Sequence, residues 1–152
     1  MASIFDVAKY ILQKKGLMSP WKLQNLCYYA QAWTLAWDAR ELFSEDFQAW
    51  RCGAVCPQLH DLFLEETDHG AREKYIVGPE DMKLGMTETL KDIEVENINT
   101  VLREYGDKEP SWLREQVCSE APWKNARGAL DALEESQEII SKDSMGEFYG
   151  SL

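Results

Sequence analysis

Three side chains with zinc-ligand chemistry are evenly spaced in the first half of the chain: Cys52, Cys56 and His60. Zinc prefers thiolate and imidazole ligands, and a four-residue spacing places side chains on one face of a helix. Gly53 and Pro57 interrupt the segment, so one continuous helix through all three is not expected. No suitable fourth ligand lies nearby. We therefore interpret the three as local structural residues and expect no metal site and no cofactor.

Nucleophilic chemistry is also weakly supported. A cysteine nucleophile needs a histidine base, and the chain has only His60 and His69, neither with a local pattern that pairs it with Cys118. The hydrolase motif G-x-S-x-G, the phosphate-binding motif G-x-x-x-x-G-K-S/T and the dinucleotide motif G-x-G-x-x-G are absent. Adjacent carboxylates such as Glu65–Glu66 are better explained as a solvated face. We expect no catalytic residues; a small metal- or thiol-dependent enzyme is the less favoured alternative.

Aromatic side chains point to a different function. Six of them in one stretch exceed what a single helix-to-core contact needs: Trp21, Tyr28, Tyr29, Trp33, Trp37 and Trp50. Trp and Tyr are enriched at protein interfaces because they provide a large contact area at low entropic cost. Most are expected in the core, whereas Trp21 and Tyr28 lie outside the main apolar stripe and are expected to be exposed. The stretch therefore favours a surface that binds another protein.

The elements that must position these side chains are mostly helical. Ser3, with Asp6 three residues later, predicts a capped first helix that ends near Gly16. Ser19 and Pro20 suit the start of a long second helix. Its apolar positions keep helical periodicity for about four turns and are expected to form a core stripe. These positions are Leu23, Leu26, Cys27, Ala30, Trp33, Thr34 and Trp37.

The rest of the chain predicts shorter elements. Alternation from residue 47 to 52 predicts a short strand that ends at Gly53, after a turn anchored by Leu42 and Phe43. Residues 67–86 are expected to be an irregular, mobile excursion with one extended piece at Tyr75 to Val77. Further helical segments are expected from Pro57, over Thr89 to Tyr105, over Trp112 to Ser119, from Pro122 and after Ser141. The predicted fold is mainly α: a compact single-domain helical bundle, residues 1–152, of about six helices with at most one small β-ribbon.

Charge and composition narrow the class of partner. The chain has 152 residues, a net charge of −11 and no apolar run near the roughly 18 residues that cross a bilayer. Residues 1–60 carry six basic and five acidic side chains, and residues 61–152 carry ten and twenty-two. Such a balance disfavours direct nucleic-acid binding and is compatible with a basic protein partner. We expect a cytoplasmic protein without membrane contact, whose four cysteines are reduced and mostly buried thiols.

Several short motifs occur in order along nearly the whole chain. They are Lys22-Leu23-Gln24, Leu26 with Tyr28-Tyr29-Ala30-Gln31, Ala49-Trp50-Arg51 with Gly53, Val55-x-Pro57, Ile98 to Gly106, Glu120-x-Pro122-Trp123-Lys124 and Ile140 to Tyr149. Together these motifs resemble the Panacea domain family. The family includes SocA-like antitoxins and phage-associated, GepA-like proteins. Two positions depart from its pattern, because Cys118 replaces a common His and Cys52-Gly53-Ala54-Val55 replaces Tyr-Gly-Pro-Val. These departures weaken a catalytic interpretation further.

The resemblance implies an antitoxin that neutralises a cognate protein toxin by direct contact. It also implies an alternative, an adaptor that delivers the toxin to an ATP-dependent protease; a purely structural phage or mobile-element protein is a third option. The residues that we expect to bind the partner are Trp21, Lys22, Gln24, Tyr28, Trp50, Arg51, Trp123 and Lys124. Five polar positions could instead tie the segments at Pro57 and Pro122 together: Lys22, Gln24, Arg51, Glu120 and Lys124.

Overall fold

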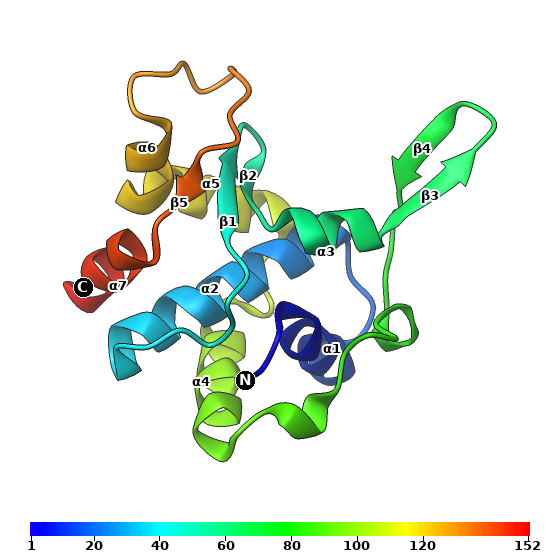
Figure 1. The fold of residues 1–152 in the computed structure, drawn as a ribbon, viewed down its shortest axis with the longest axis horizontal. Helices are drawn as coiled ribbons and strands as arrows, with labels where there is room; N and C mark the ends of the chain where they lie inside the picture. The colour runs from blue at the N-terminus through cyan, green and yellow to red at the C-terminus, as the bar shows by residue number, and fades with distance from the viewer.

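The computed structural model describes residues 1–152 as seven α-helices, five short strands and two 3-10 turns (Figure 1). The helices are α1 (Ile4–Lys15), α2 (Pro20–Asp38), α3 (Pro57–Leu62), α4 (Asp92–Tyr105), α5 (Pro110–Ser119), α6 (Ala121–Arg127) and α7 (Lys142–Gly150). The strands are β1 (Phe47–Trp50), β2 (Gly53–Val55), β3 (Leu64–Thr67), β4 (Gly70–Glu73) and β5 (Ile139–Ile140), and the 3-10 turns are Pro79–Asp81 and Thr87–Thr89. The mainly α prediction is confirmed.

Helix α2 is the spine of the fold, and other elements pack against it on several sides (Figure 1). Ser19 caps it by accepting a hydrogen bond from the Lys22 backbone N–H, and Pro20 occupies its first turn, as predicted. The prediction of a single core stripe is wrong, because Tyr29 and Gln31, outside the stripe, are buried as well. Tyr28 is completely buried, whereas Trp37 is 45% exposed. The reason is that α1, α4, α5, α7 and β2 surround the helix, so that almost its entire middle is buried.

A three-stranded antiparallel sheet, with strand order β2-β1-β5, covers one side of α2. Gln48 pairs with Val55 in β2 and with Ile139 in β5, which brings the end of the chain beside its first third. The predicted strand over 47–52 therefore stops two residues early, and Gly53 starts the next strand instead of ending the first. Gly53 has a φ of 124°, a conformation that favours glycine, so this residue permits the tight turn.

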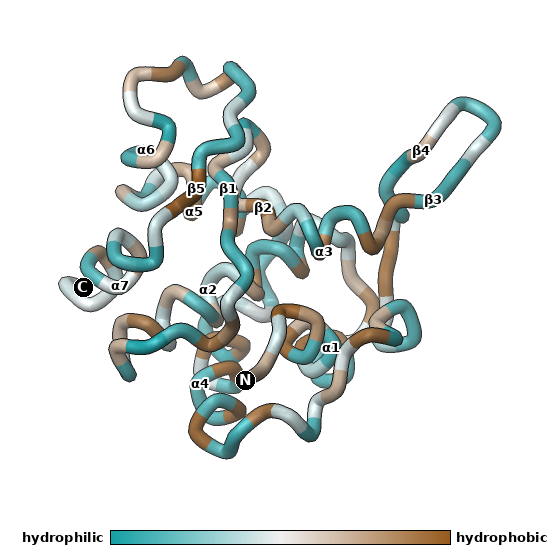
Figure 2. The backbone as a smooth tube through the Cα atoms, in the orientation of Figure 1, coloured by the Kyte–Doolittle hydropathy of each residue, from teal (hydrophilic) through white to brown (hydrophobic).

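A second sheet makes the prediction of at most one β-ribbon wrong. Strands β3 and β4 form a two-stranded ribbon that projects from the body of the molecule (Figure 1). Part of this ribbon lies in the stretch that we expected to be irregular. Its paired residues include Glu65 with Arg72, and the outer part of the ribbon is largely hydrophilic (Figure 2). Because charged residues occupy both strands, no apolar alternation marks them in the sequence.

Two glutamines of α2 fix the loops that run past it. The Gln31 side chain accepts a hydrogen bond from the Leu42 backbone N–H and donates one to the Phe43 backbone C=O, both at 2.7 Å. Seven residues earlier on the same helix, the Gln24 amide makes the same pair of bonds with the backbone of Cys56, at 2.9 and 3.1 Å. These bonds hold both loops against α2, where Leu42 and Phe43 are fully buried, as predicted.

We expect Gln31→Met to lower the free energy of unfolding by about 2–4 kcal/mol, because it leaves a buried N–H and a buried C=O without partners. Urea unfolding would show this as a fall in the midpoint of about 1–2 M with an unchanged slope. The matched control is Gln13→Met on the exposed face of α1, which should change stability by less than about 0.5 kcal/mol. Equal effects of the two substitutions would contradict the structural role of Gln31.

Candidate functional site

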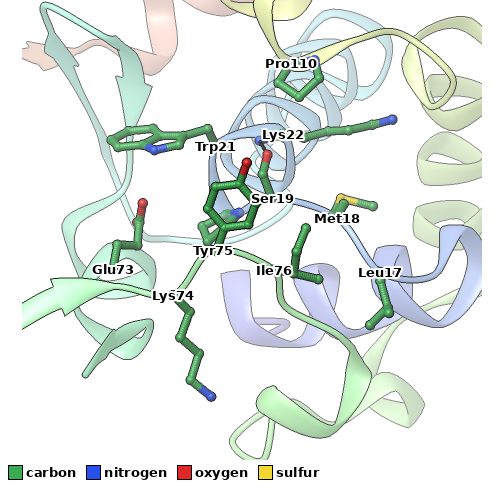
Figure 3. Close-up of a pocket in the computed structure, with 11 residues that line it drawn as sticks. Leu17, Met18, Ser19, Trp21, Lys22, Glu73, Lys74, Tyr75, Ile76 and Pro110 are labelled. Atoms are coloured by element: carbon green, nitrogen blue, oxygen red, sulfur yellow. Dashed lines mark hydrogen bonds between the residues drawn. The ribbon is translucent and has the colours of Figure 1, made fainter. Parts of the chain in front are cut away.

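A groove of about 580 Å³ opens at the N-terminal end of α2 (Figure 3). One wall is the link from α1 into α2, and the other is the chain that leaves β4. Figure 3 shows Trp21 and Lys22 pointing away from each other on either side of the groove, with Tyr75 between them. The lining residues are Leu17, Met18, Ser19, Pro20, Trp21, Lys22, Glu73, Lys74, Tyr75, Ile76 and Pro110.

Backbone pairing holds the two walls together. Met18 and Val77 form an isolated antiparallel bridge with two hydrogen bonds, of 2.9 and 3.1 Å. Of the extended piece predicted at Tyr75 to Val77, only Val77 is paired, and Tyr75 lies in a bend. Both bridge residues are buried, whereas Leu17 and Ile76, which precede them in the chain, are exposed. Antiparallel pairing places Ile76 opposite Ser19 and Gly78 opposite Leu17, so the bridge holds the two walls of the groove against each other.

Three large apolar side chains that line the groove are exposed to solvent. Tyr75 is 90% exposed, Leu17 is 68% exposed and Ile76 is 47% exposed. An isolated exposed hydrophobic residue is ordinary, but three that line one groove are typical of a surface that another molecule covers. The arrangement suits contact with an apolar or aromatic side chain of a partner protein.

Beside the groove, His60 lies between two tryptophans. Its ring is 5.9 Å from the Trp21 ring and 5.1 Å from the Trp50 ring, and its Nδ1 lies 2.8 Å from Oε2 of Glu73. Burial raises the pKa of the Glu73 carboxyl, and the nearby His60 opposes that rise. His60 therefore connects α3 to β4 at the base of the ribbon and faces a carboxylate. No three His, Cys, Asp or Glu side chains, Cys52, Cys56 and His60 included, come together where they could hold a metal ion.

Only some of the eight predicted contact residues are available to a partner. Trp21 and Lys22 line the groove, both partly exposed, and Trp50 lies next to it through the His60 contact. Gln24 and Tyr28 are buried, so the expected exposure of Tyr28 is wrong, and neither residue can touch a partner at the surface.

The remaining three predicted residues lie away from the groove. Arg51 is exposed and forms an ion pair with Glu135 at 2.9 Å, and Lys124 is exposed on α6. Trp123 is 6% exposed, and its indole N–H donates to the Trp50 backbone C=O at 2.9 Å. The Trp123 side chain is therefore used to attach α6 to β1.

Arg127 reinforces this attachment of α6. It is almost fully buried and donates to the backbone C=O groups of Ala49, Asp131 and Glu134. Its guanidinium also lies over the Trp123 ring, 4.8 Å from the ring centre. A buried cation with several hydrogen bonds can be stable where an unpaired one is not. The Pro-Trp segment of the sequence is thus a structural tie rather than part of the groove.

Glu120 also connects separate elements of the fold, as proposed for that position. One of its carboxylate oxygens accepts hydrogen bonds from the hydroxyls of Tyr29 and Tyr149, each at 2.8 Å, and the other accepts one from Gln116. Burial raises the pKa of both tyrosines, and the Glu120 charge raises it further. These bonds join α2, α7 and the start of α6 inside the core. Gln24, through Cys56, ties the structure in the same way.

Sequence reasoning missed the residues that make the groove apolar: Leu17, Tyr75 and Ile76. Leu17 follows the helix-ending Gly16, and the other two lie in the stretch expected to be irregular. The available signal was an apolar triplet, Tyr75 to Val77, within a charged, Gly-containing segment. Only the buried member of the triplet pairs with the body, and the structure was needed to show that the other two stay uncovered.

A comparison with protein families shows to which family the chain belongs. The model for the antitoxin SocA-like, Panacea domain matches residues 23–124, from the first turn of α2 to the middle of α6. The chain belongs to this family. No curated protein and no solved structure matches it. In this Panacea-domain protein, none of the helices has the length and apolar character needed to span a membrane. The matched segment includes the second wall of the groove, Glu73 to Ile76.

The thiols of this Panacea-domain protein are poor nucleophiles in the folded state. Burial raises the pKa of Cys56 and of Cys118 to about 11, and it also raises that of Cys52 and Cys27. At pH 8 a thiol with such a pKa is ionised in only about one molecule in a thousand. This environment opposes the thiol chemistry that the alternative of a small enzyme requires.

We expect the native protein to react with Ellman's reagent at least about tenfold more slowly than the urea-unfolded chain at pH 8, because its thiols are protonated and partly covered. A raised pKa keeps the thiolate scarce at low pH, so the rate should rise close to tenfold per pH unit from pH 7 to 9. Cys52→Ser and Cys118→Ser assign the two half-buried thiols. A thiol that already reacts rapidly at pH 7 and no faster at pH 9 would contradict this account.

Proposed function

We propose that this Panacea-domain protein is an antitoxin that neutralises a cognate protein toxin by direct contact through the groove at the start of α2. Family membership supports the antitoxin role. The observation that supports the surface is the exposure of Tyr75, Leu17 and Ile76 together in one groove. We place Trp21 and Lys22 at the same contact, with Trp50 beside it.

The energetics favour a few anchoring contacts. Covering one large apolar side chain contributes roughly 1.5–3 kcal/mol, and association itself costs at least about 4 kcal/mol. Three exposed apolar side chains in a fixed groove can offset this cost, particularly if an aromatic group of the toxin enters between them. The Met18–Val77 bridge and the Ser19 cap hold the walls before binding, so little ordering entropy is lost there.

The charge of the chain favours a basic toxin. The net charge is −11, so long-range attraction would speed the encounter with a basic partner. Within the groove, Lys74 is already paired with Asp81 at 2.7 Å, whereas the Lys22 side chain takes part in no ion pair. Lys22 is therefore the cation that we assign to an acidic group of the toxin. The same overall charge leads us to propose that the protein makes no direct nucleic-acid contact. We also propose that it acts in the cytoplasm.

We expect Tyr75→Ser to weaken binding to the protein encoded beside this gene by roughly thirtyfold or more, the usual cost of losing a central aromatic contact. Isothermal titration would measure binding, and growth on co-expression would measure neutralisation. The matched control is Leu133→Ser, which removes a side chain 77% exposed in the loop after α6. Both substitutions should leave stability within about 0.5 kcal/mol of the parent.

Equal binding by the Tyr75 and Leu133 variants would overturn the groove as the contact surface but leave the antitoxin role standing. Failure of the parent protein to bind its neighbour, and to relieve any toxicity of that neighbour, would overturn the role itself.

Neutralisation by direct contact also predicts the amount of toxin protein that remains in cells. We expect the amount of toxin in cells to stay unchanged when the antitoxin is co-expressed, and the purified pair to be inactive without any protease, because the contact itself blocks the toxin. Immunoblotting after translation is stopped measures the first, and an activity assay on the purified complex measures the second. If the antitoxin lowers the amount of toxin in normal cells but not in a strain that lacks its ATP-dependent proteases, the adaptor function would be favoured instead.

A further inference from the structure

A second opening lies near the other end of α2, against α4. It is a cleft of about 320 Å³ lined by Trp33, Trp37, Thr100, Val101, Glu104 and Tyr105. At a rise of about 1.5 Å per residue, Trp37 lies about 24 Å along α2 from Trp21, so this cleft is separate from the groove. It also lies at the lower limit of volumes that hold small molecules, roughly 300 Å³, so it suits a single side chain.

Aromatic rings form the walls of the cleft. The Trp33 and Trp37 rings stack with centres 5.4 Å apart and planes 30° apart. The Trp33 indole N–H donates to the Tyr105 hydroxyl at 3.1 Å, and Tyr105 stacks on Tyr29 in the core at 4.1 Å. Trp33 and Tyr105 are therefore fixed by the fold, while Trp37 remains 45% exposed. The walls are formed before anything binds.

One carboxylate of the cleft has no cation in the molecule. Glu104 is exposed, lines the cleft and takes part in none of the ion pairs of the structure. The neighbouring Arg103 donates to the Thr100 hydroxyl at 3.0 Å instead. Asp38, at the end of α2, accepts a hydrogen bond from Asn97 at 2.7 Å. Glu104 is thus free to pair with a cation that comes from outside.

Aromatic faces and a free carboxylate together recognise one kind of group. Ring faces attract cations, and the attraction is strongest for tryptophan. The planar guanidinium of arginine stacks on such rings and binds a carboxylate through two N–H groups, whereas the ammonium of lysine is a compact, strongly hydrated charge. The net charge of −11 adds long-range attraction for a basic protein. Arginine therefore fits the cleft better than lysine.

We propose that this cleft binds an arginine side chain presented by a partner protein. The guanidinium stacks on the exposed ring of Trp37 and pairs with Glu104, and the methylene groups of the side chain lie along the cleft wall at Val101. This site is independent of the proposed antitoxin groove, because it rests on residues at the opposite end of α2. A toxin with such an arginine would contact both ends of the helix.

The test is an NMR titration that needs no toxin. The probe is a five-residue capped peptide, Gly-Ser-Arg-Ser-Gly, and the readout is the set of tryptophan indole N–H signals, with those of Trp33 and Trp37 assigned by substitution to Phe. We expect saturable shifts of these two signals with a millimolar dissociation constant. The same peptide with citrulline, the neutral counterpart of arginine, should bind roughly tenfold more weakly.

Matched variants locate the site. Trp37→Ala should weaken peptide binding by about two- to thirtyfold and Glu104→Gln by about two- to fivefold. Glu66→Gln removes an exposed carboxylate on the β3–β4 ribbon and should change nothing. If Trp37→Ala disturbs the fold, Glu104→Gln and the citrulline peptide still decide the matter.

Three results would overturn the proposal. They are equal binding of the arginine and citrulline peptides, absence of shifts at Trp33 and Trp37, and equal effects of the Glu104 and Glu66 substitutions. Binding of guanidinium chloride as tightly as the peptide would mean a site for a small cation and would also overturn it. None of these results depends on whether the chain neutralises a toxin through its groove.

Discussion

The structure depends on the hydrogen bonds that four polar side chains buried along α2 make with distant segments of the chain. The helix is enclosed on several sides, yet its middle carries Gln24, Gln31, Tyr28 and Tyr29. Each buried polar group left without a partner would cost about 1–3 kcal/mol. Their partners come from distant segments: the loop at Phe43, the backbone of Cys56, and Glu120 with Tyr149. The hydrogen bonds of this one helix therefore fix the loop before β1, the junction of β2 and α3, the start of α6 and the position of α7.

The same requirement for hydrogen-bond partners distinguishes the residues that hold the fold together from those that a partner protein can reach. Side chains in the middle of α2 are committed to the interior, so a partner can reach the helix only near its two ends. At the first end, the Met18–Val77 bridge carries the chain after β4 across the entry to α2 and leaves Tyr75 and Ile76 uncovered. At the second end, Trp37 extends past the core beside Glu104 of α4. The polar core thus determines where a binding surface can form.

Local signals in the sequence were sufficient for the helices. Ser3 with Asp6, and Ser19 with Pro20, start α1 and α2 as expected, because capping depends on residues three or four positions apart. Signals that depend on distant neighbours failed. Tyr28 lies off the apolar stripe, yet Phe47 and Tyr149 pack against it from far along the chain. Strand β5 has two residues and pairs only with β1, which no local pattern could reveal.

The site was only partly predictable for the same reason. Trp21 and Lys22, which were predicted to contact a partner, line a groove, whereas Gln24 and Trp123 hold the fold together. A family motif marks the residues that a fold needs as readily as those that touch a partner, and burial distinguishes the two only once the structure is known. Tyr75 carries the most exposed surface of the groove and lies in none of the motifs.

Hydrogen–deuterium exchange on the complex with the neighbouring gene product tests the central claim most directly. We expect slower amide exchange in residues 17–22 and 73–77 on binding, with no change in the middle of α2, whose amides are already enclosed. Protection confined to other surfaces, such as α6 or the tip of the β3–β4 ribbon, would contradict the assignment of the groove as the contact.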